Sequence, residues 1–347
     1  MILTRSMGTS LSETSMSSPV YVNVKNEPFK VYGLYDYYSR IPAEVAEACG
    51  EGVQRLYRNT TGARVRFRTN SDYIVVHADL ISADIPSSKA IIASKDFDMY
   101  VVGADKKQHF HAIFSSSVPD EWNITESRLK FDNSMKDVVL NFPLTANIEN
   151  VYIGLREGSE LLPGSEYKYK KPIVFYGSSI VHGEGAMRPG NAYPAIISRK
   201  FDTDFINLGF RGSALGEEAM IEYIASLDMS VFVYDYDYNA YSLEILRNTH
   251  YRGYEIFRKK QPNTPIIFAS RVNYHVDPTY HEIRRNIIKE SYYKALAGGD
   301  RNVYFLDGEK IYPVDKRDEC TVDNTHPNDM GYSYMADAFG EIIEDLI

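Results

Sequence analysis

The sequence predicts a two-domain protein in which a β-sandwich or jelly roll precedes an α/β domain. The chain has 347 residues, which is more than one ordinary core needs. Short strand-like runs fill the first half, and apolar strands alternating with helices fill the second. The polar segment 158–171, which contains Pro and Gly, separates them. We therefore predict a disordered leader over 1–19, a β-sandwich domain over 20–165 and an α/β domain over 166–347.

The β-sandwich is predicted from runs such as ARVRFRT, DYIVVHADL and DVVLNFPL. In the first run, Val65, Phe67 and Thr69 alternate with three arginines, which is typical of a strand. Turn-rich pieces such as RTNSD and GADKK separate the runs. Strands at this spacing favour an antiparallel sandwich or jelly roll, which one helical stretch over 42–56 interrupts. We expect this region to pack on the α/β domain, although an independent lectin-like module is the alternative.

The α/β domain is predicted from five compact apolar runs: PIVFY, DFINL, SVFVYDY, TPIIFAS and NVYFLD. Segments with helical spacing follow them, the longer ones over about 243–260, 280–296 and 328–346. Continuous apolar strands that alternate with helices are typical of a parallel sheet covered on both faces. We predict a three-layer domain built on a five-stranded parallel sheet.

Composition excludes several classes of partner. The net charge of −9 and the lack of a basic stripe argue against nucleic acid as a binding partner. No apolar run approaches the ~20 residues of a membrane span. Cys49 and Cys320 form neither a metal-ligand spacing nor a disulfide framework. Residues 1–19 lack the apolar core of a signal peptide, so we expect a cytoplasmic protein and leave secretion open.

Tyrosine is the compositional exception, with 28 residues against a single tryptophan. Its apolar ring and hydrogen-bonding hydroxyl suit sheets, interfaces and sugar-binding clefts. Ordinary packing in a β-rich protein explains the same count, so composition alone leaves both explanations open.

A candidate nucleophile follows the first strand of the α/β domain. Ligands of open α/β sheets bind at the carboxyl ends of the strands. There the chain reads GSSIVHG over 177–183, and the small residues allow a tight turn from strand to helix. A hydroxyl on that turn, from Ser178 or Ser179, would face the crevice beside backbone N–H groups. The alternative is that these serines only cap the next helix.

The next two strand ends offer hydrogen-bond donors. The second strand is followed by NLGFRGSA, where a glycine would let a backbone N–H approach a substrate oxyanion. The third is followed by YDYDYNA, where Asn239 adds a side-chain amide beside two carboxylates. Glycine after a strand is commonplace, and Asn239 is equally suited to an Asx turn.

A candidate base lies near the carboxyl terminus, in DNTHPND over 323–329. Asp323, three residues before His326, can orient the imidazole through one ring nitrogen. The other nitrogen is then free to take a proton from a hydroxyl. The alternative is an ordinary loop that begins the last helix, with Asn328 or Asp329 as its cap.

Four blocks, in this order and each at a strand end, resemble the SGNH/GDSL hydrolase superfamily: YGSSIVHG, NLGFRGSA, YDYDYNA and DNTHPND. The resemblance covers about 171–347 and implies a flavodoxin-like α/β domain. The preceding β-rich region is similar to the amino-terminal domain of one bacterial branch of these esterases. The two-domain plan also resembles the second carbohydrate esterase family, whose members deacetylate plant polysaccharides.

The resemblance implies a role for each matching residue. Ser179 corresponds to the nucleophile, and its own N–H would contribute to the oxyanion hole. Gly212 and Asn239 correspond to the other two oxyanion donors. His326 corresponds to the base and Asp323 to the acid that orients it. Two departures exist: a serine stands at 178 where the family name has Asp, and Asn239 lacks the usual preceding Gly.

We therefore expect a serine esterase that cleaves short-chain esters, with acetyl as the expected acyl group, and that needs no metal or cofactor. A small acyl group is favoured because no apolar lid is visible in the sequence. The tyrosines and the accessory β domain favour a carbohydrate as the alcohol, so the expected partner is a small-molecule or oligosaccharide ester. The alternatives are a lysophospholipase or thioesterase, and a catalytically inactive carbohydrate-binding protein. Arg188, Asn191 and Tyr193 either line the substrate pocket or build the loop and helix start; the oligomeric state stays open.

Overall fold

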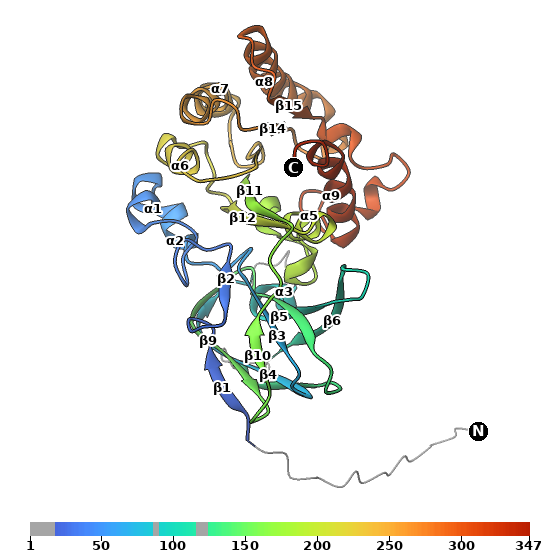
Figure 1. The fold of residues 1–347 in the computed structure, drawn as a ribbon. Coiled ribbons are helices and arrows are strands. Elements are labelled where there is room, and N and C mark those ends of the chain that lie inside the picture. Colours follow the sequence, from blue (N-terminus) through green and yellow to red (C-terminus); the bar gives the residue numbers. More distant parts are fainter. Residues whose placement is uncertain (1–17, 86–89, 116–123) are drawn as a thin grey trace, which may run out of the picture.

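The carboxyl-terminal half of the computed structural model is a parallel sheet between layers of helices (Figure 1). The structure describes residues 18–85, 90–115 and 124–347, so the expected leader lies outside the described residues except for its last two. The sheet consists of β11 (Tyr169–Gly177), β12 (Thr203–Gly209), β13 (Val231–Asp235), β14 (Ile266–Ala269) and β15 (Val303–Leu306). Its order, β12-β11-β13-β14-β15, is that of flavodoxin-like sheets. The predicted five-stranded parallel sheet is therefore confirmed.

Alternation along the strands divides the core of this domain in two. Ile173 and Phe175 of β11 pack in one cluster with the helices of one layer, which are α4 (Ser179–His182), α5 (Tyr193–Phe201) and α9 (Asp329–Ile343). Val174 and Tyr176 pack in the other cluster with α6 (Glu218–Ile224), α7 (Leu243–Lys260) and α8 (Pro278–Ala297). Each such buried side chain contributes about 1.5–3 kcal/mol. None of the helices in the described ranges is long and apolar enough to cross a bilayer.

The amino-terminal half is built from two antiparallel sheets that enclose a third core cluster. Sheet A, in the order β1-β9-β4-β7, contains β1 (Val20–Asn23), β4 (Tyr73–Ala83), β7 (Ile124–Lys130) and β9 (Ala146–Leu155). Sheet B, in the order β10-β3-β8-β5-β6 with β2 beside β3, contains β2 (Lys30–Tyr32), β3 (Arg64–Thr69), β5 (Phe97–Val102), β6 (Gln108–Phe114), β8 (Lys136–Asn141) and β10 (Leu161–Pro163). A short helix, α3 (Ile91–Lys95), precedes β5. The predicted antiparallel β-rich region is confirmed.

The helical stretch inside this half packs on the α/β domain (Figure 1). It forms α1 (Ala43–Cys49) and α2 (Glu51–Leu56), separated by Gly50, whose φ of 98° interrupts the helix. Val53 and Leu56 belong to the same core cluster as Val174 of β11. The expected packing of the two halves is thus confirmed.

Arg40, just before α1, ties the two halves together. Its side chain is fully buried, and Nη1 donates to the carbonyl oxygens of Gly209 at 2.7 Å and Asn207 at 3.2 Å. Nη2 donates to the Leu56 carbonyl at 2.7 Å. Burial lowers the pKa of Arg40 to about 9, with a smaller effect from the charge of Arg211. A guanidinium in this position fixes the loop that follows β12.

Candidate active site

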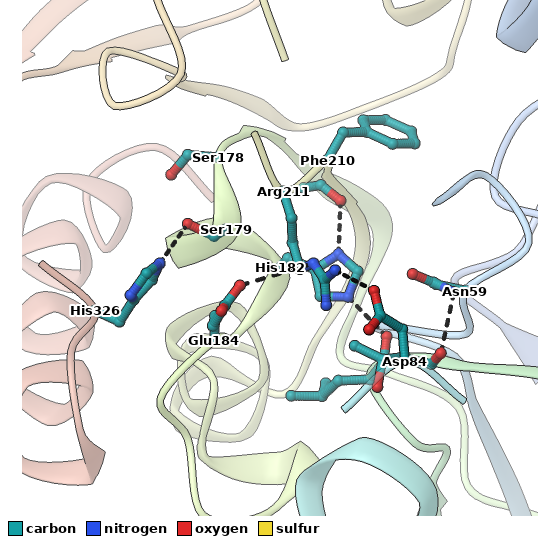
Figure 2. Close-up of polar contacts among 12 residues, drawn as sticks. Asn59, Asp84, Ser178, Ser179, His182, Glu184, Phe210, Arg211 and His326 are labelled. Carbon is teal, nitrogen blue, oxygen red and sulfur yellow. Dashed lines mark hydrogen bonds and ion pairs between the residues drawn. The ribbon is translucent and has the colours of Figure 1, made fainter. Parts of the chain in front are cut away.

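Ser179 begins α4, directly after the turn that ends β11. The turn requires glycine at 177, because a Cβ there would lie 2.0 Å from the carbonyl oxygen of Asp235. Ser178 is the cap of α4, and its Oγ accepts the N–H of Ile180 at 3.2 Å. The capping role considered for both serines therefore belongs to Ser178. The hydroxyl of Ser179 instead points toward His326 (Figure 2).

The structure brings Ser179, His326 and Asp323 together although Ser179 is far from the other two in sequence. The Oγ of Ser179 lies 2.9 Å from Nε2 of His326, and Nδ1 of His326 lies 2.7 Å from Oδ2 of Asp323. Burial raises the pKa of the Asp323 carboxyl, but hydrogen bonds from the backbone and ring of His326 outweigh burial and lower it. An ionised carboxylate only accepts, so Nδ1 carries the proton and Nε2 is free to accept from the serine.

The loop that carries His326 is held by backbone contacts. The N–H of His326 donates to Oδ1 of Asp323 at 2.8 Å, and the His326 carbonyl accepts the N–H of Val322 at 2.9 Å. Asn328 caps α9 by accepting two backbone N–H groups. The alternative role considered for this segment, beginning a helix, is thus also present, and the two roles fall on different residues.

Gly212 lies on the loop after β12, beside the Ser179 turn. Gly177 pairs with Gly209 across the β11–β12 ladder, so the two strands end together. Gly212 has a φ of 64°, which favours glycine, and a Cβ there would meet no atom within 4 Å. In this turn the N–H groups of Ser213 and Ala214 bind the Phe210 carbonyl, which leaves the Gly212 N–H without an acceptor among the described residues. This amide can therefore donate to a ligand.

Asn239 lies on the loop after β13, on the other side of β11. Gly177 also pairs with Asp235, the last residue of β13. Asn239 is 8% exposed, and its Nδ2 donates to the Phe210 carbonyl at 2.8 Å. This hydrogen bond uses one of the two protons on Nδ2 and joins the Asn239 loop to the Gly212 loop. The second proton is available to a ligand. The observed side-chain contact, to the Phe210 carbonyl, is not that of an Asx turn, which was the alternative considered for Asn239.

A buried ion cluster that the sequence does not predict holds the Asn239 loop. Asp237 is 1% exposed; Nε of Arg284 donates to its Oδ1 at 2.7 Å, and the N–H of Arg271 donates to its Oδ2 at 3.1 Å. Arg284 also donates to the Ala240 carbonyl at 2.7 Å. Burial would raise the pKa of Asp237, but the charges of Arg271 and Arg284 outweigh burial and lower it. The loop is thereby clamped on both sides of Asn239.

The Gly212 loop also contacts the β-sandwich (Figure 2). Arg211 forms an ion pair with Asp84, which follows β4, and its Nε lies 3.7 Å from Oε2 of Glu184. His182 at the end of α4 is fully buried, with its ring nitrogens 3.0 Å from the Gly209 carbonyl oxygen and 2.8 Å from that of Leu144. Both domains therefore position the candidate oxyanion donors.

Arg188 and Asn191 are half-buried and bind other parts of the protein. The guanidinium carbon of Arg188 lies 3.9 Å from the ring centroid of Phe110 in the sandwich, and its Nη1 donates to the Tyr100 hydroxyl at 3.3 Å. Nδ2 of Asn191 donates to Oδ2 of Asp329 at 2.7 Å. Both side chains stabilise the loop after α4. Of the two roles considered for them, these contacts fit building the loop and helix start.

Tyr193 is a core residue, so the substrate-binding role considered for it is wrong. Its side chain has no exposed surface, and its ring stacks on Phe339 with centroids 5.0 Å apart. Its hydroxyl donates to Oδ2 of Asp235 at 3.0 Å. Burial raises the pKa of Asp235 to about 8, against the opposing effect of the Tyr193 hydrogen bond. Burial therefore favours the protonated form of Asp235.

No group of three or more His, Cys, Asp or Glu side chains within 18–85, 90–115 and 124–347 is arranged to hold a metal ion. The expectation that the reaction needs no metal or cofactor stays a prediction.

Comparison with known proteins identifies the family. The model of the GDSL-like lipase/acylhydrolase family matches residues 170–344, and the model of the amino-terminal domain of SGNH-hydrolase-type esterases matches 20–161. No curated protein sequence matches the chain.

Solved structures repeat the two-domain plan. A putative GDSL-like lipase from Bacteroides ovatus is 27% identical, with a TM-score of 0.84 over 94% of this chain and 97% of its own. The salicylyl-acyltransferase SsfX3 of a tetracycline biosynthetic pathway is 19% identical, with a TM-score of 0.79 over 94% and 97%. The acetyl xylan esterase Est2A from the rumen bacterium Butyrivibrio proteoclasticus is 14% identical, with a TM-score of 0.57 over 94% and 98%. The chain belongs to the GDSL-like lipase/acylhydrolase family, with the amino-terminal domain of its SGNH-type esterases.

Proposed function

We propose that this protein is a serine esterase that removes short acyl groups, most simply acetyl, from carbohydrates. The observation that carries the proposal is the hydrogen-bonded chain from Ser179 Oγ through His326 to Asp323, with links of 2.9 and 2.7 Å. Membership of an acylhydrolase family supports ester chemistry at this serine. The specific roles of the three residues are our inference from this geometry.

The reaction proceeds in two acyl-transfer steps. Oγ of Ser179 attacks the ester carbonyl carbon while its proton passes to Nε2 of His326. Collapse of the tetrahedral intermediate breaks the bond to the alcohol, which leaves with that proton. Water then attacks the acyl-serine, giving one proton to His326, and the acid departs as Ser179 is protonated again. Asp323 stays ionised and stabilises the imidazolium in both steps.

The negative charge on the carbonyl oxygen needs donors on the face opposite the base. The N–H of Ser179, as the first residue of α4, has no acceptor within the helix. The Gly212 N–H and the second Nδ2 proton of Asn239 come from the neighbouring strand ends. Three donors held by buried contacts would stabilise the oxyanion without reorganising during the reaction.

The choice of a carbohydrate ester rests on the two-domain plan. The chain shares this plan with Est2A, a protein named as an acetyl xylan esterase, and at 14% identity that likeness concerns the fold. Tyrosines that remain exposed, such as Tyr21, Tyr37 and Tyr241, suit sugar binding. The competing lysophospholipase or thioesterase function requires room for a long acyl chain, whereas an acetylesterase does not.

A chain-length series separates these functions. We expect hydrolysis of p-nitrophenyl acetate and butyrate with a steep fall in kcat/KM for octanoate and palmitate. Acetate release from acetylated xylo-, manno- and cello-oligosaccharides then tests the alcohol. A maximum at long acyl chains, or no acetate from any acetylated sugar, would contradict the proposed substrate class. A catalytically inactive binding protein would hydrolyse none of these esters.

A further inference from the structure

The outer face of sheet A carries a groove that is separate from the Ser179 site. In the β-ladder Tyr21 is opposite Gly154, Tyr152 is opposite His77, and Asp79 is opposite Asn150. Their neighbours along the strands, such as Val76, Ala78 and Ile153, fill the sandwich core. Because side chains alternate between the faces of a strand, the first set shares the face that points away from the core.

Three rings shape this groove, which has a volume of about 410 Å³ and is lined by Tyr21, His77, Asp79 and Tyr152. The ring of His77 lies edge-on to Tyr21, with centroids 6.2 Å apart, and tilted to Tyr152 at 5.7 Å. Gly154 makes room for the Tyr21 ring, since a Cβ there would lie 2.8 Å from its Cε1. The rings are thus held by the sheet as fixed walls.

A chain of hydrogen bonds fixes the polar side of the groove. Nε2 of His77 lies 3.2 Å from Oδ1 of Asp79, and Nδ2 of Asn150 donates to Oδ2 of Asp79 at 3.1 Å. Asn23 in turn donates to Oδ1 of Asn150 at 3.3 Å. The side chain of Asp79 is still 36% exposed, and each carboxylate oxygen has a further lone pair. The carboxylate can accept hydrogen bonds from a ligand without rearranging.

We propose that this groove binds a saccharide unit of the polymer on which the esterase acts; the choice of ligand rests on the proposed function. A sugar ring offers an apolar C–H face to the tyrosine rings and hydroxyls to Asp79 and Asn150. The Asp79 carboxylate disfavours an anionic ligand, and Lys25, whose Nζ lies 3.5 Å from Oδ1 of Asn150, is not among the residues that line the groove. A concave site with aromatic walls and a few fixed polar groups is the usual form of a small-ligand site.

The position of the groove defines its role. The groove residues belong to strands β1, β4 and β9 of the sandwich, whereas Ser179 belongs to the α/β domain (Figure 1). A saccharide bound there holds a long substrate on the protein while the ester at Ser179 belongs to another part of the polymer. The groove should therefore increase the rate of hydrolysis of polymeric substrates. The rate for small esters such as p-nitrophenyl acetate should not depend on it.

The test measures binding by the full chain carrying Ser179→Ala. Isothermal titration with xylohexaose, mannohexaose and cellohexaose should show binding of at least one. Tyr152→Ala and Asp79→Asn, each added to that chain, should weaken this binding by at least about tenfold. Tyr293→Ala on α8, which removes another exposed tyrosine (61% exposed), serves as the matched control and should leave it unchanged. Thermal melting verifies that each variant is folded.

Two results would overturn the proposal: no binding of any of the three oligosaccharides, or equal binding by the groove variants and the control. With Ser179 intact, the groove variants should hydrolyse p-nitrophenyl acetate at the wild-type rate but lose kcat/KM on acetylated polysaccharide. Failure of the proposed esterase function would appear as absent hydrolysis of both esters, while the binding measurement would still report on the groove.

Discussion

The pKa of Asp235, a buried carboxyl next to the turn that carries Ser179, can be tested by experiment. Its carboxyl is 3% exposed at the end of β13, opposite Gly177, and its partner is the Tyr193 hydroxyl. Burial raises its pKa from 3.8 to about 8. The substitution Asp235→Asn keeps the shape and the acceptor oxygen for Tyr193 but removes the ionisation.

The sign of the effect follows from proton uptake. Between pH 4 and 8 the folded protein keeps the Asp235 proton, whereas the unfolded chain loses it. Folding is therefore favoured most below pH 4, and this contribution is lost as the pH rises to 8. At 1.36 kcal/mol per pKa unit, wild type should lose on the order of 4 kcal/mol between pH 5 and 8 through this group. Asp235→Asn should not.

Urea unfolding of both proteins at pH 5, 6, 7 and 8 measures this contribution. The free energy of unfolding of Asp235→Asn should rise relative to wild type by about 4 kcal/mol across the series. Any fixed cost of the new amide shifts all four points equally. A difference that stays constant from pH 5 to 8 would show that Asp235 ionises normally in the folded protein, and would refute this explanation.

Three further substitutions test the residues around Ser179. Asp323→Asn should lower kcat for p-nitrophenyl acetate by about 10³–10⁴ with little change in KM, because the imidazole loses its orienting charge; an unchanged kcat would exclude that role. Asn239→Ala should lower kcat by about 10²–10³ through loss of an oxyanion donor, and a rise in KM alone would contradict it. Arg284→Met leaves Asp237 buried without its closest charge, so urea unfolding should show a loss of about 3–5 kcal/mol; Arg247→Met on α7 is a control expected to change little.

The strands and helices of the α/β domain could be predicted because each element carries its own periodic signal. The five apolar runs became β11 to β15, and the segment expected over about 243–260 is α7. Strands β1 and β10 contain only four and three residues, too few for a period to be visible. The helical stretch over 42–56 was expected as one element, and Gly50 divides it.

The supporting contacts of the candidate site could not be predicted from local pattern. Arg40 binds carbonyl oxygens, which any sequence offers, at positions about 170 residues away. Arg284 finds Asp237 across 47 residues, and no spacing rule connects them. The ring and hydroxyl of Tyr193 would suit a binding site, but the packing of α5 on α9 buries the side chain. Strand ends predict that Ser179, Gly212 and Asn239 lie at one edge of the sheet. Asp323 and His326 lie well after β15, on the loop before α9, and tertiary packing brings them to Ser179.

A comparison of two neighbouring serines tests directly whether Ser179 is the nucleophile. Ser179 should be the nucleophile, whereas Ser178 caps α4 and is fully buried. In hydrolysis of p-nitrophenyl acetate, Ser179→Ala should lower kcat by on the order of 10⁶, to near background. Ser178→Ala should cost about 0.5–2 kcal/mol of stability while keeping kcat within about tenfold of wild type. Wild-type turnover by Ser179→Ala would contradict the central claim that this hydroxyl attacks the ester.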